Sequence, residues 1–245
     1  MITSAILIVF ALLALVLGAY AFYNGKKASN VNWSFLRLAV IVVVWDVGIA
    51  MYSAKISQTL SGIGMIIAEV CIAITLPLLT DYFMYVLKRK SRNHKRVMFA
   101  QFIAGAVIIV TVFTKPYLGV TLENGVLDLF ARPGWTLALA VLFSAALPLY
   151  HIYMLVNGLR RAAYKRDRSQ AFAWIITMAG CIVLLLTRFF IDLEYESGIG
   201  CYSLSLMLLM LYNFAHRYDT GAINALNMAE YFYSTINTPF LVVNP

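Results

Sequence analysis

Seven apolar stretches dominate the sequence, and each is long enough to cross the roughly 30 Å hydrocarbon core of a membrane as an α-helix. They cover residues 2–23, 33–53, 59–87, 97–115, 134–158, 170–191 and 200–217. Only 12% of the residues are charged, whereas soluble globular proteins contain about 25%. The sequence therefore predicts an all-α integral membrane protein built as a bundle of seven transmembrane helices.

The distribution of Lys and Arg predicts how the bundle is oriented, because basic loops near helix ends stay in the cytoplasm. The first stretch has no basic residue before it, so we interpret it as an uncleaved helix and not as a signal peptide. In the seven-helix arrangement one side carries only Lys55, Lys115, Arg132 and Arg188. The other fifteen basic residues are Lys26, Lys27, Arg37, Lys88, Arg89, Lys90, Arg92, Lys95, Arg96, Arg160, Arg161, Lys165, Arg166, Arg168 and Arg217. We expect the N-terminus outside and the C-terminus in the cytoplasm.

The longest external connection, residues 116–134 between the fourth and fifth helices, contains the segment VTLENGVLDLF. Asn124-Gly125 separates two runs that alternate apolar and polar residues, a pattern typical of a β-hairpin with a type I′ turn. Leu122 would then face Leu127 across the two strands. The hairpin could cover the mouth of the bundle as a lid or simply connect two helices.

Three ionisable residues lie in the outward part of the apolar stretches, namely Asp46, Glu69 and Arg188. Each costs about 3 kcal/mol at mid-bilayer, so such residues face the interior of a bundle. Thr177 and Trp174 share a helix face with Arg188. These five residues are candidates for an outward-opening cavity that binds a small polar ligand or holds an ion-pair latch. The alternative is structural: Arg188 reaches the headgroups and hydroxyl groups satisfy the acids.

Asp81 lies nearer the cytoplasmic side, one turn after Pro77. It could stabilise a kink at the proline or pair with a basic residue at the inner mouth of the bundle. His151 lies at a comparable depth in the fifth stretch and is a candidate partner. A local hydrogen bond is the simpler interpretation of this histidine.

Several function classes lack their motifs in this sequence. We find no nucleophile and base pair, HExxH motif or phosphate-binding loop, and Cys71, Cys181 and Cys201 show no metal-ligand spacing. The last apolar stretch has no lysine that could hold retinal. We therefore expect no catalytic residue, metal or cofactor. The net charge of +8 resides mainly in loops between helices, which favours anionic lipid over nucleic acid as the partner.

The seven-helix region, residues 1–217, is followed by a segment whose pattern predicts a cytoplasmic helix over residues 218–237. Apolar residues recur there at heptad-like spacing, as in a coiled coil or a surface helix. They are Ala222, Leu226, Ala229, Tyr233 and Ile236. Residues 238–245, TPFLVVNP, resemble the first strand of a further domain that is cut short.

Seven helices, short loops and a helix leading into STINTPFLVVN together resemble the membrane sensor region of bacterial histidine kinases and diguanylate cyclases. In that family the region is commonly followed by a PAS domain. The resemblance implies a homodimeric receptor module in the bacterial inner membrane that detects a small ligand or lipid and signals to a cytoplasmic output domain. The alternative is a small-molecule or proton-coupled transporter, or a lipid-binding membrane protein.

Overall fold

The computed structural model describes eight parts of the chain: residues 2–24, 30–87, 92–124, 134–161, 168, 171–180, 183 and 204–212. Six helices account for most of them: α1 (Ile2–Asn24), α2 (Asn30–Ala54), α3 (Gln58–Val86), α4 (Arg92–Val112), α5 (Lys115–Asn124) and α6 (Gly134–Arg161). Residues 171–180 and 204–212 are helical as well, and no strand occurs among the described residues.

Five of the seven apolar stretches are confirmed as helices, α1 to α4 and α6, with bounds that differ from the prediction by at most five residues. The sixth and seventh stretches are represented by the helical residues 171–180 and 204–212. In the described part of the chain, three helices are long and apolar enough to cross a membrane, namely those of α1, α2 and α3. A fourth joins them if α4 and α5, which meet at a bend of 61°, are counted as one span.

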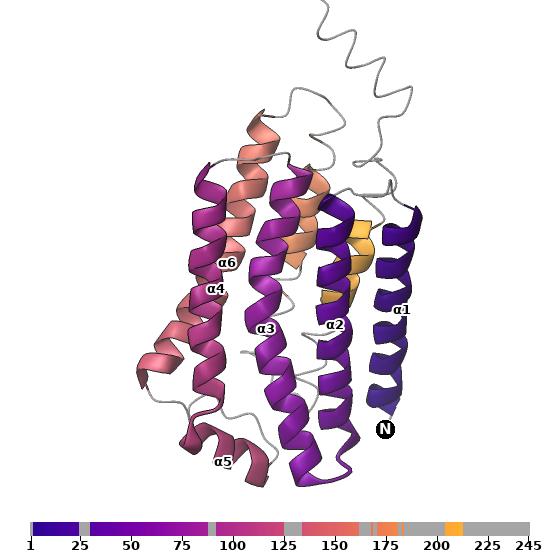
Figure 1. Cartoon of the computed structure of the whole chain (residues 1–245). Helices are drawn as coiled ribbons and strands as arrows, with labels where there is room; N and C mark the ends of the chain where they lie inside the picture. The colour runs from indigo at the N-terminus through magenta and orange to yellow at the C-terminus, as the bar shows by residue number, and fades with distance from the viewer. Residues whose placement is uncertain are drawn as a thin grey trace, which may run out of the picture.

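The helices form an up-and-down bundle in which α1, α2, α3 and α4 lie side by side and alternate in direction (Figure 1). Short connections explain this arrangement, since α2 and α3 are separated by only Lys55, Ile56 and Ser57. Lys55 adopts a positive φ of 51°, and Ser57 caps α3 by accepting a hydrogen bond from the Leu60 N–H at 3.1 Å. We call the end that carries this turn and α5 the α5 end, and the opposite end, where α2 and α4 begin, the basic end.

Most of the surface of α1 is apolar and exposed. Only a narrow stripe, including Leu7, Ala11 and Ala14, is buried against the bundle. Large apolar residues cover the remaining surface, and Val9 and Val16 are each 63% exposed. A helix that is apolar all round is suited to a membrane.

The backbones of α2 and α3 approach each other closely at two glycines. A Cβ atom on Gly48 would lie 2.9 Å from the Gly64 carbonyl oxygen, and a Cβ atom on Gly64 would meet the Gly48 carbonyl oxygen in turn. Small residues permit such close contact between membrane helices, where dispersion forces replace the hydrophobic effect. This crossing fixes the two helices that carry all three buried acids described below.

The prediction of a β-hairpin between the fourth and fifth helices is wrong in its first half, because Lys115–Asn124 form helix α5. Its second half, including Leu127, lies outside the described residues. Pro116 suits the first turn of a helix, and Asn124 ends α5 where a type I′ turn had been expected. Contact with α3 decides the outcome: Tyr117 and Thr121, four residues apart, are both buried.

Candidate functional site

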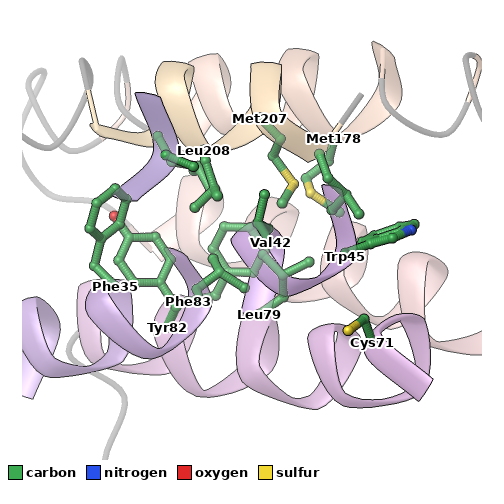
Figure 2. Close-up of a cluster of buried hydrophobic side chains, with 14 of the residues drawn as sticks. Phe35, Val42, Trp45, Cys71, Leu79, Tyr82, Phe83, Met178, Met207 and Leu208 are labelled. Atoms are coloured by element: carbon green, nitrogen blue, oxygen red, sulfur yellow. The ribbon is translucent and has the colours of Figure 1, made fainter. Parts of the chain in front are cut away.

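The hydrophobic core joins segments that are distant in the sequence. Residues from α2 and α3 meet residues from the helical segments 171–180 and 204–212 (Figure 2). The side chains labelled there are Phe35, Val42, Trp45, Cys71, Leu79, Tyr82, Phe83, Met178, Met207 and Leu208. Three buried acidic residues, Asp46, Glu69 and Asp81, belong to the same two central helices.

Asp46 bonds directly to the last described helix. Its side chain is fully buried on α2, and the Ser205 hydroxyl donates a hydrogen bond of 2.8 Å to Asp46 Oδ2. A buried polar group away from water needs such a partner, because an unsatisfied one costs several kcal/mol in hydrocarbon. This bond crosses 159 residues of sequence, so it links the position of α2 to that of residues 204–212.

Glu69 is buried on α3, with 8% of its surface exposed. At 1.5 Å of rise per residue it lies about 16 Å from the start of α3, and Asp46 lies about 12 Å from the end of α2. Both positions are measured from the α5 end, so the two acids lie at similar depth. Both acids thus lie in the half of the bundle nearer the α5 end, and their place on the outward side of a membrane stays a prediction.

Trp174 and Thr177 occupy the inner side of segment 171–180, as predicted, and both are buried. Trp174 packs against Tyr82 and Phe83 of α3, with ring centroids 6.0 and 5.4 Å apart. The Thr177 hydroxyl donates to the Ala173 carbonyl at 2.9 Å, one turn earlier in its own helix. Trp174 therefore belongs to an aromatic cluster with α3. Arg188, the predicted cation of this group, lies outside the described residues.

Asp81 is held near the basic end by two residues of α2. The Ser34 hydroxyl donates to Asp81 Oδ2 at 2.8 Å, and Arg37 Nη1 lies 4.0 Å from the same oxygen. The Asp81 side chain is 5% exposed and that of Arg37 is 60% exposed. A basic residue therefore does accompany Asp81 at this mouth of the bundle, as one of the two interpretations of the sequence expected.

His151 of α6 is fully buried and bonds to Thr80, the neighbour of Asp81 in the sequence. Thr80 Oγ1 and His151 Nε2 lie 2.7 Å apart and share a hydrogen bond. The ring of His151 also stands edge-on to Phe83, with centroids 5.6 Å apart. Asp81 and His151 thus lie on adjacent parts of α3 and α6, each with a hydroxyl partner of its own.

Sequence reasoning missed the three hydroxyl partners Ser34, Thr80 and Ser205. A signal was present, because each is a small polar residue inside an apolar stretch, and such residues form hydrogen bonds between helices in membranes. Their partners lie 47, 71 and 159 residues away. Helical periodicity within one segment cannot identify pairs at these separations.

The remaining predicted elements, the helix over 218–237 with its apolar seam and the strand over 238–245, lie outside the described residues. Within the described ranges no group of three or more His, Cys, Asp or Glu side chains is arranged to hold a metal ion. In comparisons with known families and with curated proteins, the chain matches no family model and no curated protein.

Proposed function

We propose that the chain is a seven-helix sensor module of a bacterial inner membrane, with its N-terminus outside and its C-terminus in the cytoplasm. Helices at five of the seven apolar stretches support the first part of this proposal. The positions of the basic residues support the second. Arg37, Arg96 and Arg160 lie at the basic end, while Lys55 and Lys115 lie at the α5 end.

The hydrogen bond between Asp46 and Ser205 is the observation that carries the signalling role. A sensor must convert ligand binding into movement of the helix that leaves the membrane. In this bundle a buried acid bonds to residues 204–212, part of the stretch that precedes the expected cytoplasmic helix. A ligand that competes for Asp46 would release this contact and shift the position of the last helix.

Asp46 and Glu69 are the groups best suited to receive the ligand in this proposal. Both are buried acids at similar depth below the α5 end. Carboxylates accept hydrogen bonds and attract cations, so the favoured ligand is a small molecule with an amino group or several hydroxyl groups. Helix α5 packs across α3 at this end, where a Cβ atom on Gly62 would lie 2.8 Å from the Thr121 carbonyl oxygen. Movement of α5 would control access.

A ligand screen on the purified full chain tests this proposal. Thermal shifts with amines, polyols and amino acids would reveal ligands that stabilise the folded protein by mass action. Asp46→Asn should abolish the shift for a true ligand, while Lys115→Gln, at an exposed surface position, should leave it intact. A spin-label distance between α2 and residues 204–212 should change when the ligand binds. An unchanged distance in the presence of saturating ligand would overturn the signalling role.

Transport is the second candidate, supported by the same buried acids, which could couple to protons. Proteoliposomes separate the two functions. A transporter accumulates the labelled ligand inside the vesicle in response to a pH gradient, whereas a sensor binds it without accumulation. We expect binding without uptake.

Dimerisation through residues 218–237 is part of the sensor proposal. Single cysteines at Leu226 and Ala229 should form disulfide crosslinks between two copies in membranes, because these residues share the apolar seam. A cysteine at Asn227, off the seam, is the matched control. Equal crosslinking at the seam and at the control position would argue against a specific helical dimer.

A further inference from the structure

A small cavity opens at the basic end of the bundle, between the first turns of α2 and the last turn of α3. Its volume is about 190 Å³, and it is lined by Asn30, Trp33, Arg37 and Tyr85. Phe22 of α1 packs edge-on against Trp33 with ring centroids 4.8 Å apart. None of these residues belongs to the Asp46 and Glu69 site, which lies in the opposite half of the bundle.

Each of the four lining side chains carries a hydrogen-bond donor: an amide, an indole N–H, a guanidinium and a phenol. The guanidinium has five N–H groups, and the carboxylate of Asp81 lies 4.0 Å from one of its nitrogens. Asp81 thus accompanies one nitrogen of Arg37, whose side chain is 60% exposed, so other N–H groups of the guanidinium can bind an acceptor from solvent. A pocket of donors around a guanidinium is suited to a phosphate group.

On the exposed surface of α2, a stripe of three valines continues from this cavity. Trp33, Arg37, Val40, Val44 and Val47 follow one another at spacings of four, three, four and three, so they share one helix face. Val40, Val44 and Val47 are 45, 42 and 42% exposed. A hydrocarbon chain that extends from the cavity toward the membrane centre would lie along these valines.

We propose that this cavity binds the phosphate headgroup of an anionic phospholipid whose acyl chain packs along the valine stripe. Pockets that enclose whole drug-sized ligands measure roughly 300–1,000 Å³. At about 190 Å³ this cavity is smaller, so it suits a phosphate headgroup whose acyl chains stay outside. Trp33 and Tyr85 are residue types that concentrate at the level of lipid headgroups. In the sequence, Lys26 and Lys27 precede α2, and Lys88, Arg89 and Lys90 follow α3.

Bound lipid would act on the bundle through Arg37. A phosphate that draws the guanidinium outward would alter its contact with Asp81, which also accepts the Ser34 hydrogen bond between α2 and α3. The site is therefore placed to adjust the packing of α2 against α3 in response to the lipid composition of the membrane. This role does not depend on the identity of the ligand at Asp46.

Native mass spectrometry of the full chain with phosphatidylglycerol or phosphatidylcholine of equal chain length measures the headgroup preference. We expect phosphatidylglycerol to bind more tightly, and Arg37→Gln to weaken it roughly threefold to tenfold, as suits a charged hydrogen bond at a partly exposed site. Arg96→Gln removes an exposed arginine at the same end of the bundle and should have no effect. Tyr85→Phe keeps the ring, removes one donor, and should weaken binding less than Arg37→Gln.

Glycerol phosphate distinguishes a lipid from a soluble phosphate, since it carries the headgroup chemistry without acyl chains. It should not compete at concentrations where phosphatidylglycerol saturates the protein, and equal competition would overturn the lipid assignment. Equal losses in Arg37→Gln and Arg96→Gln would show only diffuse attraction between basic residues and anionic lipid. If Arg37→Gln does not fold by far-ultraviolet circular dichroism, an unchanged preference in Tyr85→Phe would overturn the proposal.

Discussion

Replacement of Ser205 by alanine should expose the energetic link between α2 and the last described helix. The substitution removes one hydroxyl group and leaves the volume of the site almost unchanged. Ser205 is only 5% exposed, and its hydroxyl donates to Asp46 Oδ2 over 2.8 Å. Asp46 is fully buried, so water does not readily replace the lost donor.

The magnitude follows from the burial and the short distance. Hydrogen bonds between membrane helices contribute about 0.6 kcal/mol on average and about 1.7 kcal/mol at most. Both partners are buried here and their geometry is close, so we expect a coupling energy in the upper half of that range, about 1 to 1.7 kcal/mol. For a chain of this size that loss lowers Tm by roughly 2 to 7 °C.

A double-mutant cycle of Ser205→Ala and Asp46→Ala isolates this coupling from the other contacts of Asp46. Unfolding in sodium dodecyl sulfate, followed by circular dichroism, supplies the free energies. Ser61→Ala is the matched control, because Ser61 is similarly buried at 6% but its hydroxyl lies 3.4 Å from the Tyr52 carbonyl oxygen. A coupling energy near zero, or a loss in Ser205→Ala no larger than in the control, would refute the link.

Three further substitutions, at Gly64, Gly62 and Thr80, test the packing of α3, and Gly119→Ala and Thr80→Ser serve as controls. Gly64→Ala places a methyl group against the backbone of α2 and should destabilise the protein by about 1 to 3 kcal/mol in the same unfolding assay. A methyl group at Gly119 meets nothing within 4 Å, so the control Gly119→Ala should be neutral or slightly stabilising. The methyl group of Gly62→Ala would lie against the backbone of α5. Amide hydrogen exchange in α5 should therefore accelerate while exchange in α2 stays unchanged. Equal acceleration in both helices would indicate general destabilisation instead. Thr80→Val should cost about 1 kcal/mol by removing the hydrogen bond to His151, and Thr80→Ser should retain most of the stability; equal losses in the two variants would show that the bond contributes little.

Hydropathy was sufficient to position the long helices. The bounds of α2 and α3 follow from runs of apolar residues, because a membrane helix satisfies its own backbone and needs no partner segment to be recognised. Helix α5 was not predictable in the same way. Its alternating pattern fits a strand, and its helical form depends on contact between Thr121 and Gly62, which lie 59 residues apart.

The buried acids were recognisable from the sequence, but their partners were not. An aspartate in an apolar stretch must find a hydrogen bond, so Asp46 and Asp81 were evident candidates. Which hydroxyl each one binds depends on how three helices pack, namely α2, α3 and the helical residues 204–212. The sequence offered a cation or hydroxyl groups as partners for Asp46, and one hydrogen bond to it comes from Ser205, a neutral donor with a short side chain.

The small energy of the hydrogen bond between Asp46 and Ser205 limits how a ligand could move residues 204–212 by breaking it. Moving a two-state equilibrium from 1:99 to 99:1 requires about 5.5 kcal/mol of differential binding. Release of the Asp46 and Ser205 bond involves only about 1 to 1.7 kcal/mol, near the top of the range for such bonds, so breaking it cannot drive the whole transition. A ligand would have to gain most of its differential energy elsewhere, and Glu69 is the next buried acid at the same depth. Glu69→Gln should therefore reduce ligand-induced movement of residues 204–212 more than Ser205→Ala does. The reverse order would place the switch in the hydrogen bond itself.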